Sequence, residues 1–213
     1  MAKNLGNVYI LGDSYSTFLG YNPSDCPAYY EPMADYIDVT RVEDTWWHML
    51  ISETGANLVM NYSWSGSTVC YSWYEGIVPE QSFVYRIQKS LVDGECLGEK
   101  IDTVIILGAT NDWWADSPVG EVQYSGWTEE DCCYCLPAFC RILDHIRSSG
   151  KDIRIINVIN MDMKQAIADG MVTACQHYGA DCLQLANLDL VGGHPTALGM
   201  KQIKDQIIEY LNK

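Results

Sequence analysis

Short apolar runs rich in β-branched residues alternate along the chain with longer amphipathic stretches. The amphipathic stretches predict helices, and this alternation is typical of a parallel sheet whose strands are joined by crossover helices. We therefore expect an α/β protein. The predicted strands lie near residues 7–11, 57–62, 102–107 and 153–159, with a weaker one near 182–186.

Capping residues and prolines set the expected helix boundaries. Gly55 is suited to the left-handed residue that ends a first helix, and Pro137 is expected to kink a later one because it lacks an N–H group. The predicted helices begin at Asp44 or Thr45 and at Ser82, cover residues 128–149 and 163–178, and finish with one that runs from Pro195 to about Leu211.

The chain contains no internal repeat, low-complexity tract or linker, so its 213 residues predict a single domain spanning residues 1–213. Residues 15–43 and 112–127 resist assignment to helix or strand. Long irregular loops in a compact domain are often functional. Because both stretches directly follow candidate site residues, we expect them to have a functional role.

The net charge of the chain limits the classes of partner that it can bind. Its 28 acidic and 13 basic side chains give a formal net charge of −15, which repels phosphate backbones, so no nucleic-acid partner is expected.

No run approaches the roughly 18 to 20 apolar residues that span a bilayer, so no membrane span is expected. Without a leader in the sequence as given, we expect a cytoplasmic protein, or a secreted or periplasmic one if a signal peptide has been removed. The sequence gives no indication of oligomeric state.

The nine cysteines are expected to be free thiols, since a chain of this size does not need disulfide staples. Cys132 and Cys135 form a C-x-x-C spacing, but no second pair of ligands follows at zinc-site spacing. Cys132 also falls on the apolar stripe of the helix predicted over 128–149, which favours a packed thiol. Cys175 and Cys182 flank a turn and are expected to remain free. Neither a metal nor a cofactor is expected, because phosphate-binding and dinucleotide-binding glycine patterns are absent too.

Polar, glycine-containing signatures follow the predicted strands. Gly12-Asp13-Ser14 ends the first, Ser65-Gly66 follows the second, and Gly108-Ala109-Thr110-Asn111 follows the third. In an open parallel sheet, ligands bind at the carboxyl ends of the strands. His194 lies in a glycine-containing loop before the last helix and reaches the same edge. We therefore expect one site at this edge.

The residue types in these signatures suit nucleophilic catalysis. A serine hydroxyl needs a base to take its proton, and His194 is the one histidine in a predicted loop. The other histidines are expected to lie on the surface or to pack, and they are His48, His145 and His177. An oxyanion needs hydrogen-bond donors, for which the N–H groups of Ser14 and Gly66 and the carboxamide of Asn111 are suitable. The sequence thus predicts Ser14 as nucleophile and His194 as base.

Taken together and in order, the segments around Ser14, Gly66, Asn111 and His194 resemble the SGNH (GDSL) hydrolase superfamily over nearly the whole chain. The resemblance implies a flavodoxin-like three-layer α/β/α sandwich. It also implies ester hydrolysis through a serine acyl-enzyme, with Ser14, Gly66 and Asn111 as the oxyanion hole. The activity expected on this basis is that of a serine esterase or acylhydrolase.

One position departs from the pattern of that superfamily. An aspartate usually stands three residues before the histidine and fixes its tautomer, whereas this chain has Val191 there. Two alternatives remain open from the sequence. Asp189 could be brought within reach of His194 by a bulge at Gly192 and Gly193, or a backbone carbonyl could accept the proton of the His194 Nδ1 atom.

Aromatic residues crowd the segments around the proposed site, and about half are expected to pack in the core. The substrate-binding candidates are Tyr15, Trp64, Trp113 and Trp114. Flat aromatic faces suit sugars or a compact acyl group, so we expect an esterase that removes small acyl groups, acetyl foremost, from a carbohydrate or a similar carrier. The alternatives are a lysophospholipase or thioesterase for longer acyl chains, and a non-catalytic member that binds acylated glycans.

Overall fold

The computed structural model describes residues 4–94, 100–149 and 152–213 and contains a five-stranded parallel sheet. Its strand order, β2-β1-β5-β6-β7, is the flavodoxin-like order, in which the second parallel strand lies outside the first. All five predicted strands are confirmed, including the weak last one. They are β1 (Asn7–Gly12), β2 (Asn57–Ser63), β5 (Thr103–Gly108), β6 (Arg154–Ile159) and β7 (Asp181–Gln184).

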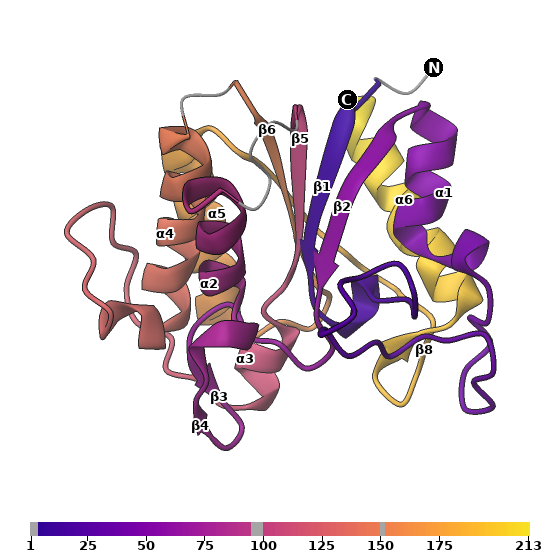
Figure 1. Cartoon of the computed structure of the whole chain (residues 1–213), viewed down its shortest axis with the longest axis horizontal. Helices are drawn as coiled ribbons and strands as arrows, with labels where there is room; N and C mark the ends of the chain where they lie inside the picture. Colours follow the sequence, from indigo (N-terminus) through magenta and orange to yellow (C-terminus); the bar gives the residue numbers. More distant parts are fainter. Residues whose placement is uncertain (1–3, 95–99, 150–151) are drawn as a thin grey trace.

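Helices cover both faces of the sheet, so the expected three-layer sandwich is confirmed (Figure 1). On one face lie α1 (Trp46–Thr54) and α6 (Ala197–Leu211). On the other face lie α2 (Phe83–Ile87), α4 (Cys135–Ser148) and α5 (Gln165–Tyr178), while the short α3 (Thr110–Trp114) follows β5. No helix in the described ranges is long and apolar enough to cross a bilayer.

Strand β1 divides the core into two parts, because successive side chains of a strand point to opposite faces. Val8 and Ile10 pack with the residues of α1 and α6, whereas Tyr9 and Leu11 pack with those of α2, α4 and α5. All four side chains have no exposed surface. The central strands are therefore apolar on both faces, as buried parallel strands usually are.

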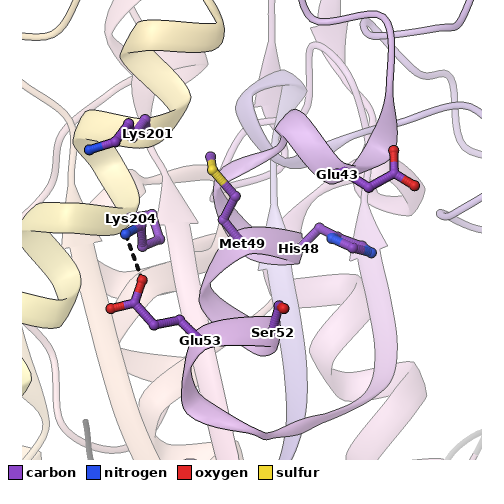
Figure 2. A pocket seen from close by; sticks show the side chains of 7 residues that line it. All are labelled: Glu43, His48, Met49, Ser52, Glu53, Lys201 and Lys204. Atoms are coloured by element: carbon purple, nitrogen blue, oxygen red, sulfur yellow. Dashed lines mark hydrogen bonds and ion pairs between the residues drawn. The ribbon is translucent and has the colours of Figure 1, made fainter. Parts of the chain in front are cut away.

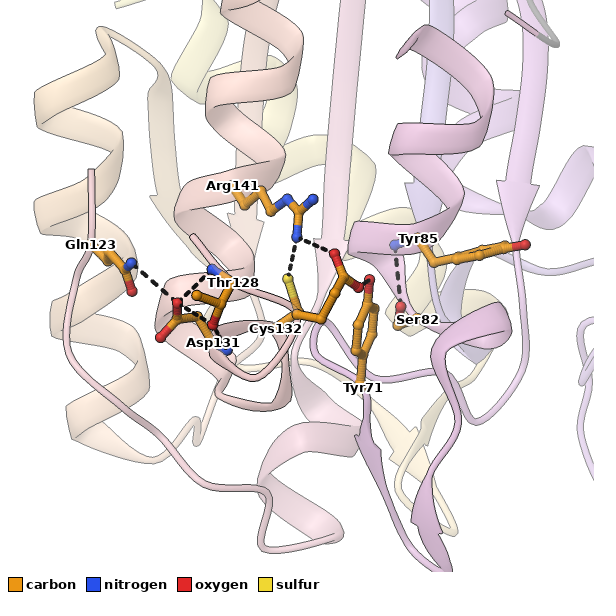
Figure 3. Close-up of polar contacts among 9 residues, drawn as sticks. Tyr71, Ser82, Tyr85, Gln123, Thr128, Asp131, Cys132 and Arg141 are labelled. Carbon is orange, nitrogen blue, oxygen red and sulfur yellow. Dashed lines mark hydrogen bonds and ion pairs between the residues drawn. The ribbon is translucent and has the colours of Figure 1, made fainter. Parts of the chain in front are cut away.

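The predicted caps of the first two helices are present. Thr45, rather than Asp44, caps α1: its Oγ1 accepts a hydrogen bond from the His48 N–H at 3.4 Å. Gly55 ends α1 with a φ of +63°. Ser82 caps α2 by accepting from the Tyr85 N–H at 3.2 Å (Figure 3). Beyond α2 the chain continues as a single π-helical segment, Gln88–Val92.

The third and last predicted helices begin later than their sequence patterns suggested. Helix α4 starts at Cys135, after a 3-10 turn, so Pro137 lies in its first turn. The N–H groups of the first turn have no intrahelical acceptor, so a proline there removes no hydrogen bond from the helix. Pro137 is therefore not expected to kink α4. Helix α6 starts at Ala197, because Thr196 caps it by accepting from the Gly199 N–H at 3.1 Å. Pro195 lies in a short strand instead.

Cys132 lies in the 3-10 turn rather than on α4, so its predicted place on the helical stripe is wrong. It is nevertheless fully buried, and burial raises the pKa of its thiol. Arg141 of α4 donates to the Cys132 Sγ at 2.9 Å and to Glu129 at 3.1 Å, while the Tyr71 hydroxyl donates to Glu129 from the other side (Figure 3). This cluster fastens the turn to α4. The eight cysteines within the described ranges are free, and Cys96 lies outside those ranges.

Candidate active site

Ser14 stands at the carboxyl end of β1, on a tight turn. Asp13 caps this 3-10 turn (Ser14–Ser16) by accepting from the Tyr15 N–H at 3.0 Å. Gly12 leaves room for the turn, because a Cβ atom there would lie 2.6 Å from the Ser16 side chain. Ser14 itself is 4% exposed. Its hydroxyl is therefore held by a packed scaffold at the edge where ligands bind to parallel sheets.

Asp13 carries a buried carboxyl group with only part of its hydrogen-bonding capacity used. The residue has no exposed surface, and its Oδ2 atom has no hydrogen-bond partner among the described residues. Burial raises the pKa of Asp13 from 3.8 to about 7, and the nearby carboxylate of Asp112 acts in the same direction. Asp13 therefore binds a proton in much of the population near neutral pH.

His194 faces Ser14 from a short hairpin formed by β8 (Leu190–Val191) and β9 (His194–Pro195). The His194 Nε2 atom lies 2.9 Å from the Ser14 Oγ atom. The Tyr15 hydroxyl donates to the Gly193 carbonyl at 2.6 Å. The Tyr30 hydroxyl donates to the Pro195 carbonyl at 2.9 Å. The carbonyls on both sides of the histidine are thus fixed by tyrosines.

Aromatic rings also enclose the imidazole. Tyr29 stacks on His194 with 3.6 Å between ring centroids and 7° between ring planes, and Trp114 approaches edge-on at 6.0 Å. Burial lowers the pKa of His194 below its ordinary 6.5, against the opposing effect of the Gly192 carbonyl. The imidazole is therefore neutral at pH 7, the form that can accept a proton from a serine.

Of the two alternatives for orienting His194, the backbone carbonyl is the one at the Nδ1 atom. Nδ1 lies 3.3 Å from the Gly192 oxygen. The Asp189 carboxylate instead accepts a hydrogen bond from the Thr196 hydroxyl, and the Asp189 carbonyl accepts from the Thr196 N–H at 3.1 Å. Asp189 therefore fastens the hairpin to the start of α6, and the expectation that it orients His194 is corrected.

Replacing Val191 by aspartate is expected to raise the pKa of His194 by about one pH unit, because an opposite charge a few ångströms away stabilises the imidazolium. Val191 is 52% exposed and pairs with His194 across the β8–β9 hairpin, so a carboxylate fits there. NMR titration of the imidazole measures the shift. The control is Leu198→Asp on α6, which adds the same charge at another exposed position. An equal shift in both variants would mean that only the overall charge matters.

Gly66 and Asn111, the other predicted donors, lie in segments joined by hydrogen bonds. Gly66 has a φ of +83°, which glycine adopts without strain, and its N–H has no acceptor among the described residues. Asn111 is 4% exposed and donates one Nδ2 hydrogen to the Ser67 carbonyl at 3.0 Å, which leaves its second amide hydrogen for another acceptor. The loop reaches the serine turn through the Trp64 N–H, which donates to the Gly12 carbonyl at 3.1 Å.

Arg86 holds these segments together, a role that the sequence did not predict. It is fully buried, and its guanidinium donates to the Gly12 carbonyl at 3.2 Å, the Ser67 hydroxyl at 2.9 Å, the Gln81 carbonyl at 3.1 Å and the Tyr62 carbonyl. Burial lowers its pKa to about 10, so it stays charged at neutral pH. The sequence feature that could have indicated this role is Arg86 itself, a charged residue within the otherwise uncharged segment that forms α2.

Asp112 is a second buried residue whose role was not predicted, although it directly follows Asn111. Its carboxylate accepts from the Val69 N–H at 2.7 Å, the Cys70 N–H at 3.3 Å and the Cys70 thiol at 3.2 Å. Burial raises its pKa despite these bonds. Asp112 thereby fixes the segment after Gly66 against α3.

The aromatic substrate candidates divide into buried and exposed residues. Tyr15 is 1% exposed and cannot wall a cleft, so its assignment is corrected to a support of the β8–β9 hairpin. Trp64 is half-buried against the core. Trp113 and Trp114 are 38% and 42% exposed and remain available to a ligand. Tyr29, which stacks on His194, was not among the candidates.

A separate hollow of about 390 Å³ lies between α1 and α6 (Figure 2). The Lys204 ammonium in its wall pairs with Glu53 at 2.7 Å and with Asp205 at 2.6 Å, so its charge is already compensated. The hollow contains none of the residues that converge on Ser14. It offers no comparable arrangement of nucleophile and base.

Comparisons with known proteins find relatives that match nearly the whole chain. The sequence profile described as GDSL-like lipase/acylhydrolase matches residues 6–211. A crystal structure described as a GDSL-like lipase from Bacteroides ovatus is 37% identical, with a TM-score of 0.90 and 98% of each chain covered. A second one, from Bacteroides uniformis, is 39% identical with a TM-score of 0.89, covering 97% of this chain and 95% of that one.

A family two carbohydrate esterase from Cellvibrio japonicus shares the fold, with 13% identity and a TM-score of 0.62 over 100% of this chain and 63% of its own. No match was found among curated proteins. The profile match and the two Bacteroides structures cover nearly the whole sequence. The chain therefore belongs to the GDSL-like lipase/acylhydrolase family of serine ester hydrolases.

Proposed function

We propose that the protein hydrolyses esters of small acyl groups, acetyl foremost, through an acyl-enzyme on Ser14. The observation that carries this proposal is the 2.9 Å contact between the Ser14 Oγ and His194 Nε2 atoms at the carboxyl edge of the sheet. A neutral imidazole in hydrogen-bond contact with a serine is the arrangement that activates the hydroxyl.

In the proposed mechanism, Ser14 Oγ attacks the ester carbonyl while its proton passes to His194 Nε2. The negative charge that develops on the carbonyl oxygen accepts hydrogen bonds from the N–H groups of Ser14 and Gly66 and from the Asn111 carboxamide. Collapse of the tetrahedral intermediate releases the alcohol, which takes the proton from Nε2. Water, which gives a proton to the same imidazole, then attacks the acyl-enzyme. The carboxylic acid leaves, and Ser14 Oγ takes the proton back from Nε2.

The Gly192 carbonyl takes the place of the carboxylate that usually supports the histidine. It accepts a hydrogen bond from the Nδ1–H group, which leaves Nε2 as the unprotonated atom facing Ser14. A neutral carbonyl stabilises the imidazolium less than a carboxylate would. The Tyr29 ring, stacked at 3.6 Å, limits rotation of the imidazole and so contributes to its orientation.

The substrate part of the proposal is supported by the side chains exposed near the site. Trp114 borders His194, and Trp113 and Trp114 both leave more than a third of their surface to solvent. Flat aromatic faces stack well on sugar rings, whereas long acyl chains are usually held in apolar channels. An acetylated carbohydrate suits these surfaces.

Hydrolysis of p-nitrophenyl acetate, butyrate and octanoate tests this proposal. The kcat/KM is expected to be highest for acetate and to fall with chain length, because Ser14 is only 4% exposed and leaves little room beside the acyl carbon. Release of acetate from an acetylated methyl glucoside tests the carbohydrate part. A maximum at octanoate would favour the longer-chain acylhydrolase. Background rates for every ester, together with binding of the acetylated glucoside, would favour the non-catalytic alternative.

A further inference from the structure

We infer that the β3–β4 hairpin, Ser72–Trp73 and Gly76–Ile77, positions the two oxyanion donors that lie outside the serine turn. This inference rests on the proposed esterase function. Trp73 and Tyr74, adjacent residues at the tip of the hairpin, each hydrogen-bond one of the donor residues. They are positioning residues, because they act on Gly66 and Asn111 rather than on the substrate.

Tyr74 fixes the orientation of the Asn111 carboxamide. Its hydroxyl donates to the Asn111 Oδ1 atom at 2.9 Å. On the other side of the amide, Nδ2 donates to the Ser67 carbonyl at 3.0 Å. A carboxamide held at both ends cannot rotate its oxygen into the place of its nitrogen. The remaining Nδ2 hydrogen is therefore kept available as a donor, and an oxygen facing the oxyanion would repel it.

Trp73 acts on the Gly66 backbone. Its indole N–H donates to the Gly66 carbonyl at 2.8 Å. Gly66 has an open surrounding, since a Cβ atom placed on it would meet no atom within 4 Å. No packing contact therefore fixes Gly66 on its Cβ side, and hydrogen bonds contribute to its backbone direction. The Trp73 contact holds the Gly66–Ser67 peptide, which adjoins the peptide that carries the Gly66 N–H, and it leaves that N–H free to donate.

The base of the hairpin is anchored, so its tip can act as a rigid support. The Ser72 hydroxyl donates to the Cys133 carbonyl at 2.8 Å. The Ser72 carbonyl accepts from the Ser117 hydroxyl at 2.9 Å. These contacts come from the segments before α4 and after α3. The tip remains at the surface, where Tyr74 is 46% exposed.

Tyr74→Phe removes the hydroxyl and keeps the ring, so the fold should be retained. We expect kcat for p-nitrophenyl acetate to fall about fivefold to tenfold, the value of one lost hydrogen bond, with little change in KM. The contact acts on transition-state charge, which explains the effect on kcat alone. Trp73→Phe removes the second contact by the same logic and is expected to lower kcat similarly.

A double-mutant cycle separates positioning from general damage. In an Asn111→Ala background, Tyr74→Phe should have almost no further effect, because its partner is gone. The matched control is Tyr134→Phe, a tyrosine 38% exposed whose hydroxyl has no hydrogen bond among the described residues. Its kcat should equal that of the wild type.

Full kcat in both Tyr74→Phe and Trp73→Phe would overturn the inference, as would equal losses in Tyr134→Phe. Additive effects of Tyr74→Phe and Asn111→Ala would also overturn it. These outcomes differ from failure of the proposed function itself, which would appear as a wild-type protein without ester hydrolysis above background. In that case the hairpin would have no oxyanion hole to position.

Discussion

Ser14→Ala is expected to reduce kcat/KM for p-nitrophenyl acetate by about 10⁴-fold or more, leaving a rate close to background. The reason is that alanine cannot form the acyl-enzyme, and no other described hydroxyl is recorded within hydrogen-bond distance of the His194 Nε2 atom. The residual rate would come from the oxyanion donors acting on water. Steady-state kinetics, with electrospray mass spectrometry of the protein after brief exposure to the ester, measures both the rate and the acyl adduct.

Ser65→Ala is the matched control for that experiment. Ser65 precedes Gly66 in the loop that follows β2, and its hydroxyl makes no hydrogen bond with the described residues. Its activity and its acyl adduct should match those of the wild type. An adduct that persists in Ser14→Ala would show that another residue carries the acyl group, and the proposed mechanism would then be wrong.

His194→Ala is expected to lower kcat/KM by about 10³-fold to 10⁴-fold, because Ser14 then has no base to take its proton. In the wild type, kcat/KM should rise with pH with a midpoint below 6.5, since burial lowers the pKa of His194. The variant should lack this rise. Activity assays between pH 4.5 and about 8 measure the profile. In the variant only catalysis by hydroxide should remain, which increases steadily with pH and has neither midpoint nor plateau.

His177→Ala serves as the control. His177 lies on α5, where its ring stacks on Tyr124 at 3.8 Å, and it should keep the wild-type profile. If His194→Ala retained the rise and His177→Ala lost it, the base would have been assigned to the wrong histidine. If both variants retained it, the titrating group would lie elsewhere, and buried Asp13 would be the first candidate.

The sequence predicted the sheet well, because apolar β-branched runs such as those of β5 and β6 have few alternatives to burial between helices. Helix starts were less predictable. The helical spacing before Cys135 matches α4, but the backbone there closes a 3-10 turn whose contacts are made with distant parts of the chain. Thr196 likewise replaced Pro195 at the start of α6, since its hydroxyl bonds both Asp189 and the Gly199 N–H.

The sequence placed Ser14 and His194 at the same edge of the sheet because each lies in a recognisable glycine-containing turn, whereas it did not indicate which residues support them. Tyr29 reaches His194 from a loop without regular structure, and Arg86 reaches several carbonyls from a short helix. Contacts of this kind depend on how loops fold back on the sheet edge, which periodicity does not encode. The partner of the His194 Nδ1 atom was undecidable for the same reason.

The pKa values of Asp13 and His194 shift in opposite directions, which sets stability and the proposed activity against each other as pH changes. The pKa of Asp13 is about 7 in the folded protein and 3.8 as an ordinary carboxyl, so the folded state binds the Asp13 proton more tightly. Below pH 3.8, Asp13 is protonated in both the folded and the unfolded protein, so its ionisation does not change the free energy of unfolding. As pH rises from 3.8 to about 7, the free energy of unfolding falls, and above about 7 the total loss is about 4 kcal/mol. The His194 imidazole, whose pKa burial lowers below 6.5, becomes neutral as pH rises and can then act as the proposed base. Mildly acidic surroundings thus offer a compromise between a neutral imidazole and an uncharged aspartate beside Ser14.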